Sequence, residues 1–148
     1  MIEFTFNTDF ILDNKEHVSD WLLSLANSEG FTIKNLHYNY VSVEKIQSIN
    51  NQFLNHDYPT DVIAFDYCED NELSGEVFVC QKIVVQNAAN YSQTIENETL
   101  RVLCHALFHL CGHKDKNSKD LAIMRSAEDK AIAAFHSTYK YIIFAQMF

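Results

Sequence analysis

The chain has 148 residues, of which 47% are hydrophobic and 21% are charged, with a net charge of −9 from 11 basic and 20 acidic residues. This length suits one globular domain, which we expect to span residues 1–148, and the composition excludes an intrinsically disordered chain. The acidic balance argues against a broad nucleic-acid surface, although it allows a local basic cleft. The sequence has neither a basic apolar leader nor a run of about 20 apolar residues. We therefore expect a cytoplasmic protein that is not bound to a membrane.

The first half of the chain alternates predicted strands and helices. Residues 2–6 (IEFTF) alternate apolar and polar side chains with the period of two that is typical of a half-buried strand. Residues 14–30 place apolar side chains at helical spacing, with Asn14 as a capping residue and a glycine as the stop. Residues 36–43 alternate again and predict a second strand. Ser42 can then cap a helix whose apolar positions are Ile46, Ile49 and Phe53.

The middle of the chain predicts two further strands and a helix. After Pro59, residues 61–65 (DVIAF) are typical of a third strand. Residues 69–75 (EDNELSG) predict a polar loop, and residues 76–80 (EVFVC) a fourth strand. A helix over residues 81–93 follows.

Two amphipathic helices are predicted in the last third of the chain. The first, over residues 94–110, carries four leucines on one face, and the second covers residues 118–135. The order β-α-β-α-β-β-α-α-α indicates an α+β fold with a small mixed sheet of about four strands packed with helices. Residues 137–148 receive no assignment.

Two histidines one helical turn apart indicate a metal site. His105 and His109 are four residues apart, so their rings emerge on the same face of a helix and can reach one ion. Zinc peptidases use this spacing in HExxH, but Ala106 stands where their catalytic glutamate would be, which disfavours a peptidase. Because such a pair also arises by chance, the spacing alone leaves a purely structural role open.

His113 and Asp115 are alternatives for the third ligand. On a straight helix, His105 and His113 would lie about 12 Å apart along the axis, too far to share one ion with ligands about 2 Å away. Gly112 can end the helix in the left-handed conformation and let the following residues fold back. Spacing alone does not choose between the two residues.

Three sequence blocks resemble the YbeY family of metal-dependent rRNA-maturation endoribonucleases. HALFHLCGHKD (105–115) is similar to the family pattern HGxLHLxGyDH, INNQFLNHDYPTDVIAF (49–65) to LNxxYRxxDxPTDVLSF, and GEVFVC (75–80) to GDIxIC. The segment MRSAE (124–128) adds a weaker fourth similarity. The blocks occur in the family's order, so the resemblance implies that fold, with a zincin-like metal-binding helix.

The resemblance implies a ligand set for the metal. Its first, fifth and eleventh positions fall on His105, His109 and Asp115, which leaves His113 outside the set. The family usually has histidine at the third position, but a carboxylate oxygen binds zinc at nearly the same distance as an imidazole nitrogen. We therefore expect one zinc ion per chain, with Fe, Mn or Ni as alternatives. The family's arginine, thought to act at the phosphate, is replaced by Leu54, which cannot bind a phosphate.

The resemblance also implies a function and partners. It implies a single-strand-specific metal-dependent endoribonuclease that acts in small-subunit rRNA processing and ribosome biogenesis, with RNA and the ribosomal small subunit as partners. Such an enzyme needs an open ligand position, so the two histidines should line a groove that solvent can reach. One alternative is a non-catalytic ribosome-assembly module with a structural metal. The other is a metal hydrolase of a small substrate.

Five further residues near the motifs have two interpretations each. Asp57, Thr60 and Asp61 support the histidines as hydrogen-bond partners, or else Asp57 and Thr60 shape, together with Pro59, the turn before a strand. Lys114 and Lys116 flank the candidate aspartate and either supply the positive charge that the arginine would have given or remain solvated.

Overall fold

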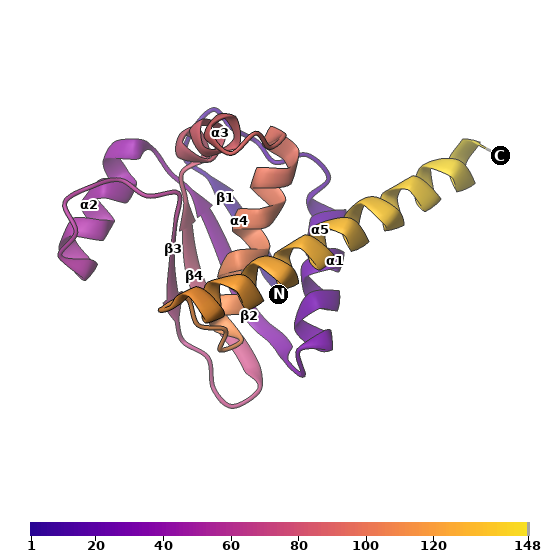
Figure 1. The fold of residues 1–148 in the computed structure, drawn as a ribbon, viewed down its shortest axis with the longest axis horizontal. Coiled ribbons are helices and arrows are strands. Elements are labelled where there is room, and N and C mark those ends of the chain that lie inside the picture. The colour runs from indigo at the N-terminus through magenta and orange to yellow at the C-terminus, as the bar shows by residue number, and fades with distance from the viewer. Residues whose placement is uncertain (148) are drawn as a thin grey trace.

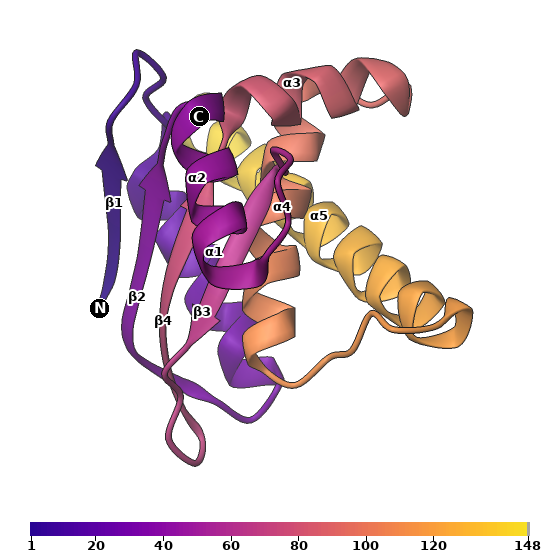
Figure 2. The same ribbon diagram turned by 90° about the vertical axis from the view of Figure 1, so that its left-hand side faces the viewer.

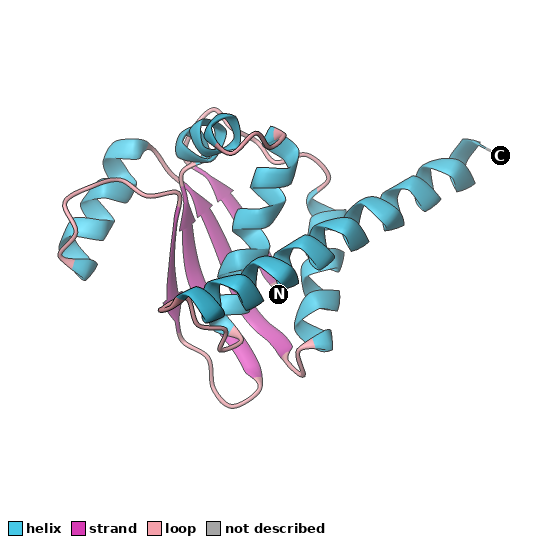
Figure 3. Cartoon of the chain, in the orientation of Figure 1, coloured by secondary structure: helices cyan, strands magenta, loops and turns pink. Residues whose placement is uncertain are grey.

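The computed structural model describes residues 1–147, with side chains described as far as Thr138. Its elements follow the predicted order of strands and helices (Figures 1 and 3). They are β1 (Ile2–Phe6), α1 (Lys15–Ser28), β2 (Thr32–Tyr40), α2 (Val43–Leu54), β3 (Val62–Asp66), β4 (Glu72–Val79), α3 (Gln81–Asn90), α4 (Ile95–Leu110) and α5 (Ser118–Met147). The predicted α+β fold with a small mixed sheet is therefore confirmed.

The four strands form one mixed sheet in the order β1-β2-β4-β3. β2 pairs in parallel with both β1 and β4, whereas β3 pairs antiparallel with β4 in a hairpin. Figure 2 shows the strands side by side, with α2 in front of them and α4 and α5 behind. The sheet is thus covered on both faces where β3 and β4 lie.

The strand side chains alternate between two hydrophobic clusters. In β3, Val62 and Ala64 pack against the larger cluster, which also contains the leucines of α4, while Ile63 belongs to the smaller cluster beneath α2. In β4, Val77 faces the larger cluster and Phe78 the smaller one. The period of two therefore places α4 and α2 on opposite faces of the same hairpin.

Helix α4 carries the two candidate histidines and is largely buried. Its predicted leucine face is confirmed, because Leu100, Leu103, Leu107 and Leu110 are all buried. Thr94 begins the helix, and its hydroxyl accepts a hydrogen bond from the backbone N–H of Asn97 at 3.0 Å. The buried face fixes the helix on the sheet and turns the opposite face toward solvent.

Gly75 in β4 lets the last turn of α4 approach the sheet closely. A Cβ atom at this position would lie 3.0 Å from Leu110 Cδ1 and 3.0 Å from the backbone oxygen of Phe65. Both separations are shorter than ordinary van der Waals contact. Glycine is thus needed here because of space.

A Schellman motif ends α4. The N–H of Gly112 donates to the carbonyl of His109 at 3.0 Å, and the N–H of His113 donates to the carbonyl of Phe108 at 3.0 Å. Gly112 has a φ of +100°, so the predicted left-handed turn is confirmed. The ring of His113 also contacts the ring of Phe108, with centroids 5.3 Å apart. The chain therefore turns away from the helix axis at Gly112, three residues after His109.

Buried polar groups join α5 and α4 to the rest of the core. Trp21 of α1 donates its indole N–H to the carbonyl of Ala131 in α5 at 2.8 Å. Tyr38 of β2 donates its hydroxyl to the carbonyl of Leu103 in α4 at 2.9 Å. Both hydrogen bonds satisfy the polar atom of a large buried aromatic side chain.

Within the described part of the chain, no helix combines the length and apolar character that crossing a membrane requires.

Several predicted element boundaries were wrong. The polar loop expected at residues 69–75 is shorter, because β4 already begins at Glu72, and β2 begins at Thr32 rather than at residue 36. These two ends pair with each other, Thr32 opposite Glu72 and Ile33 opposite Leu73. Tertiary pairing thus extends both strands through sequence that is locally polar.

The predicted helices differ from the structure at three ends. Asn14 occupies the N-cap position of α1 in the left-handed conformation (φ 58°), and its side chain makes no capping hydrogen bond. Ser42 caps α2 as expected, with its hydroxyl 3.1 Å from the N–H of Lys45. α3 ends at Asn90 rather than at residue 93, whereas α5 continues beyond residue 135 to Met147, away from the sheet (Figure 1).

The cap of α4 predicts the effect of substituting Gly112. Nothing lies within 4 Å of a Cβ built there, so Gly112→Ala adds backbone strain without a clash. We expect it to lower the free energy of unfolding by about 1–2 kcal/mol, measured by urea denaturation. Gly112→Asn should lose less, because asparagine adopts the left-handed conformation more readily. Equal losses in the two variants would contradict this explanation.

Candidate functional site

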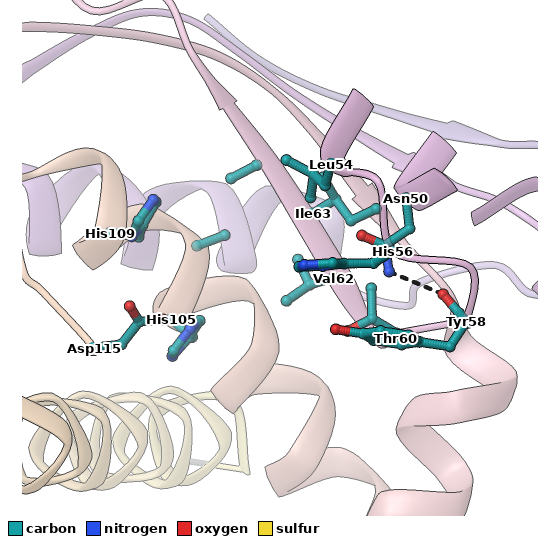
Figure 4. Close-up of a pocket in the computed structure, with 12 residues that line it drawn as sticks. Asn50, Leu54, His56, Tyr58, Thr60, Val62, Ile63, His105, His109 and Asp115 are labelled. Carbon is teal, nitrogen blue, oxygen red and sulfur yellow. Dashed lines mark hydrogen bonds between the residues drawn. The ribbon is translucent and has the colours of Figure 1, made fainter. Parts of the chain in front are cut away.

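A surface pocket of about 330 Å³ lies beside the exposed face of α4. One wall comes from α4 and the segment that follows it, and the other from the end of α2, the loop after it and β3 (Figure 4). The lining residues are Asn50, Leu54, His56, Tyr58, Thr60, Val62, Ile63, Ala64, His105, Ala106, His109 and Asp115. Both predicted histidines therefore line a solvent-reached groove, as expected for an open site.

A buried carboxylate fixes the ring of His105. The Nδ1–H of His105 donates to Oε2 of Glu128 in α5 at 2.7 Å, and Glu128 is only 4% exposed. A carboxylate can only accept in this bond, so Nε2 is the ring nitrogen left to bind something in the pocket. This is the arrangement in which metal-binding histidines are commonly held.

Arg101 compensates the buried charge of Glu128. Its Nη1 lies 3.0 Å from Glu128 Oε1, and its Nη2 lies 2.8 Å from Asp129 Oδ1. Its Nε lies 3.8 Å from Glu98 Oε1, one turn earlier on α4. A buried carboxylate without such a partner would be costly, so this ion pair stabilises the contact between α4 and α5.

The surroundings of His105 are strongly acidic. The hydrogen bond with Glu128 raises the pKa of His105, and partial burial opposes this increase. The negative charges of Asp61 and Asp115 raise the same pKa further. A position where carboxylates favour the imidazolium is one where a bound cation is also electrostatically favoured.

The two alternatives for the third ligand have different surroundings. Asp115 lines the pocket together with His105 and His109, and Figure 4 shows its side chain beside His105. His113 is not among the lining residues, and its Nε2 forms a hydrogen bond with Glu29 at the end of α1. His113 therefore lies outside the pocket that the two histidines line. Its position follows from the Schellman motif, which carries His113 toward α1 before the chain reaches Asp115.

The candidate ligands share a pocket without forming a ready-made metal site. Among the described side chains, no group of three His, Cys, Asp or Glu residues converges closely enough to hold an ion. The donor chemistry nonetheless fits, since two imidazoles and one carboxylate with an open side form a common catalytic zinc set. Asp115 lies in the segment between α4 and α5, whereas both histidines lie on α4.

Of the three other residues considered as supports of the histidines, only Thr60 lines the pocket. Thr60 lines the pocket, and Asp61 accepts from Asn87 at 3.4 Å while its charge acts on His105. Asp57 lies outside the lining and accepts from Gln47 of α2 at 3.2 Å, which favours its role in shaping the loop.

The positions of several residues in or near the pocket were not predictable from the sequence. Lys114 and Lys116 are not among the lining residues, and Leu54 does line the pocket with a 45% exposed side chain. His56 and Tyr58 were not predicted, because they lie at unspecified positions of the motif. Glu128 was noted only within the MRSAE segment, although its place one helical turn after the buried Met124 could have indicated a buried carboxylate.

Comparison with known proteins identifies the family. The family model described as Endoribonuclease YbeY matches residues 5–136. The chain belongs to the YbeY family. A relative from Flavobacterium johnsoniae, named Endoribonuclease YbeY, is 43% identical over 136 residues, which cover 92% of this chain and 98% of the relative. A relative of the same name from Bacteroides thetaiotaomicron is 39% identical over 119 residues, covering 80% of this chain and 87% of the relative.

A solved structure shares the fold of the chain. The solution structure of a protein from Thermotoga maritima superimposes with a TM-score of 0.68 at 29% identity, covering 95% of this chain and 93% of that one. The family resemblance based on three motif blocks is thus confirmed. The pocket therefore belongs to a protein of an endoribonuclease family.

The contact between His105 and Glu128 predicts a change in pKa. Glu128→Gln removes the main cause of the raised value, so the pKa of His105 should fall toward its ordinary value of about 6.5. NMR titration of the ring in chelator-treated protein measures this value. Asp129→Asn is the matched control, because Asp129 also pairs with Arg101 but has a side chain that is 59% exposed. The larger shift must occur in the Glu128 variant.

The same contact determines the sign of one pH effect on stability. Since folding raises the pKa of His105, its protonated ring stabilises the fold fully below the pKa of the unfolded state. This contribution is lost as the pH rises through the higher pKa of the folded state. Urea denaturation across that interval should show the loss in the wild type and a smaller loss in Glu128→Gln.

Proposed function

We propose that the chain is a metal-dependent endoribonuclease that cleaves single-stranded RNA in the maturation of small-subunit rRNA. The observation that supports this most directly is one pocket that His105, His109 and Asp115 line in a protein of the YbeY family. The named relatives are endoribonucleases, so RNA is the substrate class. The ribosomal small subunit as partner and a cytoplasmic location are parts of the same proposal.

We propose His105, His109 and Asp115 as the ligands of one zinc ion, with iron, manganese or nickel as alternatives. A divalent ion in such a site polarises a phosphoryl oxygen and activates water. Glu128 holds the ring of His105 in one orientation and one tautomer, with Nε2 toward the pocket. Asp115 adds a negative charge that two histidines alone would lack, which strengthens binding of a divalent cation.

The pocket lacks a side-chain cation of the usual kind for a phosphate. None of its twelve described lining residues is lysine or arginine, and Leu54 occupies the position of the family's arginine. The remaining groups that can carry positive charge are the three histidines, His56, His105 and His109. Stabilisation of the phosphate in this chain therefore depends mainly on the bound metal.

An RNA cleavage assay tests the proposed function. Protein loaded with zinc should cleave an unstructured RNA, leave a perfect duplex intact and lose its activity when a chelator is added. Circular dichroism should show that the chelated protein stays folded, because the leucine face of α4 packs in the core without any metal. Unfolding on chelation would instead support a structural metal. Activity only on small phosphate esters would support a small-substrate hydrolase.

Paired substitutions test the third ligand. Asp115→Ala should lower zinc affinity by more than the roughly 10–100-fold that changes in supporting residues cost. His113→Ala should leave zinc affinity close to the wild-type value, because His113 is paired with Glu29 outside the pocket. Competition titration with a zinc-binding dye measures both affinities. An equal or larger loss in His113→Ala would show that the ligand set is wrong.

A further inference from the structure

Two stacked rings form part of the pocket wall opposite the candidate ligands. The rings of His56 and Tyr58 have centroids 5.2 Å apart and planes inclined by only 14°. Both residues line the pocket, and Figure 4 shows the ring of His56 extending from the loop toward the side of His105. The two stacked rings thus form part of the pocket wall on the side away from His105 and His109.

The backbone that carries these rings is fixed to α2. Asn50 is 2% exposed, and its side-chain Nδ2–H donates to the carbonyl of Tyr58 at 2.9 Å. Its backbone carbonyl accepts the N–H of His56 at 3.2 Å. Between them, Asp57 accepts from Gln47 at 3.2 Å. Because the loop is held by backbone atoms and by Asp57, the two rings are positioned without using their own polar atoms. The surface is therefore preorganised, which lowers the entropic cost of binding.

The stack still presents aromatic surface to solvent. Tyr58 remains 53% exposed although one ring face contacts His56. Exposed aromatic rings stack on unpaired bases with little dependence on sequence, because every base has an aromatic face. A paired base inside a duplex does not offer that face. Since no lysine or arginine is among the described lining residues, this wall offers RNA aromatic surface and hydrogen-bonding groups rather than a fixed positive charge.

We propose that His56 and Tyr58 form a stacking platform for one unpaired base next to the cleaved phosphodiester. The inference rests on the proposed endoribonuclease function and adds to it how an unpaired strand is recognised. The pocket volume of about 330 Å³ lies at the lower end of the range of roughly 300–1,000 Å³ for ligand pockets, so it holds only a short part of an RNA chain. The platform would bind one base while the adjacent phosphate faces His105 and His109.

Binding of a fluorescent, unstructured RNA tests the platform. In the presence of chelator, so that no cleavage occurs, Tyr58→Ala should weaken binding by roughly 5- to 100-fold in fluorescence anisotropy. Tyr58→Phe should bind like the wild type, because it keeps the ring. Tyr91→Ala is the matched control, since Tyr91 is 61% exposed at the end of α3 and lies outside the pocket. Thermal unfolding checks that all variants are folded.

A substrate with one abasic nucleotide gives the decisive comparison. Moved along the RNA, the abasic nucleotide should weaken binding to the wild type at one position next to the cleavage site. In Tyr58→Ala it should cause no further loss there. Wild-type affinity in both Tyr58→Ala and His56→Ala would overturn the platform, as would a loss confined to the rate of cleavage. A wild-type protein that binds RNA by this pattern but never cleaves it would refute the proposed function and leave the platform intact.

Discussion

The hydrogen bond between His105 and Glu128 joins the candidate site to the fold. Glu128 lies on α5, and its two oxygens contact two residues of α4, His105 at 2.7 Å and Arg101 at 3.0 Å. Because Glu128 is buried, it requires both partners, and the ion pair with Arg101 holds α5 against α4 at the same time. The orientation of the imidazole and the packing of the two helices therefore depend on one carboxylate. A displacement of α5 would turn the ring of His105 as well.

The two walls of the pocket are attached to different hydrophobic clusters. Helix α4 belongs to the larger cluster, whereas α2, which holds the loop of His56 and Tyr58, packs on the smaller one. Strand β3 connects them, because Ala64 packs against the larger cluster and Ile63 belongs to the smaller one. The candidate ligands and the stacked rings are thus carried by helices that pack on opposite faces of the same sheet.

The parts of the structure that depend on local chemistry were predictable from the sequence. The leucine spacing predicted α4, Ser42 predicted the start of α2, and Gly112 predicted the left-handed turn that ends α4. Features that depend on distant pairing were missed, such as the early starts of β2 and β4, which pair with each other through polar residues. The role of Glu128 was missed for the same reason, since its partners lie 23 and 27 residues earlier in the chain.

The close contact at Gly75 limits how this part of the sequence can change over evolution. A side chain at position 75 would meet two obstacles, the Cδ1 atom of Leu110 and the backbone oxygen of Phe65. A smaller residue at position 110 would remove the first obstacle, but no substitution removes a backbone oxygen. A second-site change at position 110 should therefore rescue a Gly75 mutant only in part. Substitutions at the end of α4 can therefore relieve only one of the two close contacts that a side chain at position 75 would make.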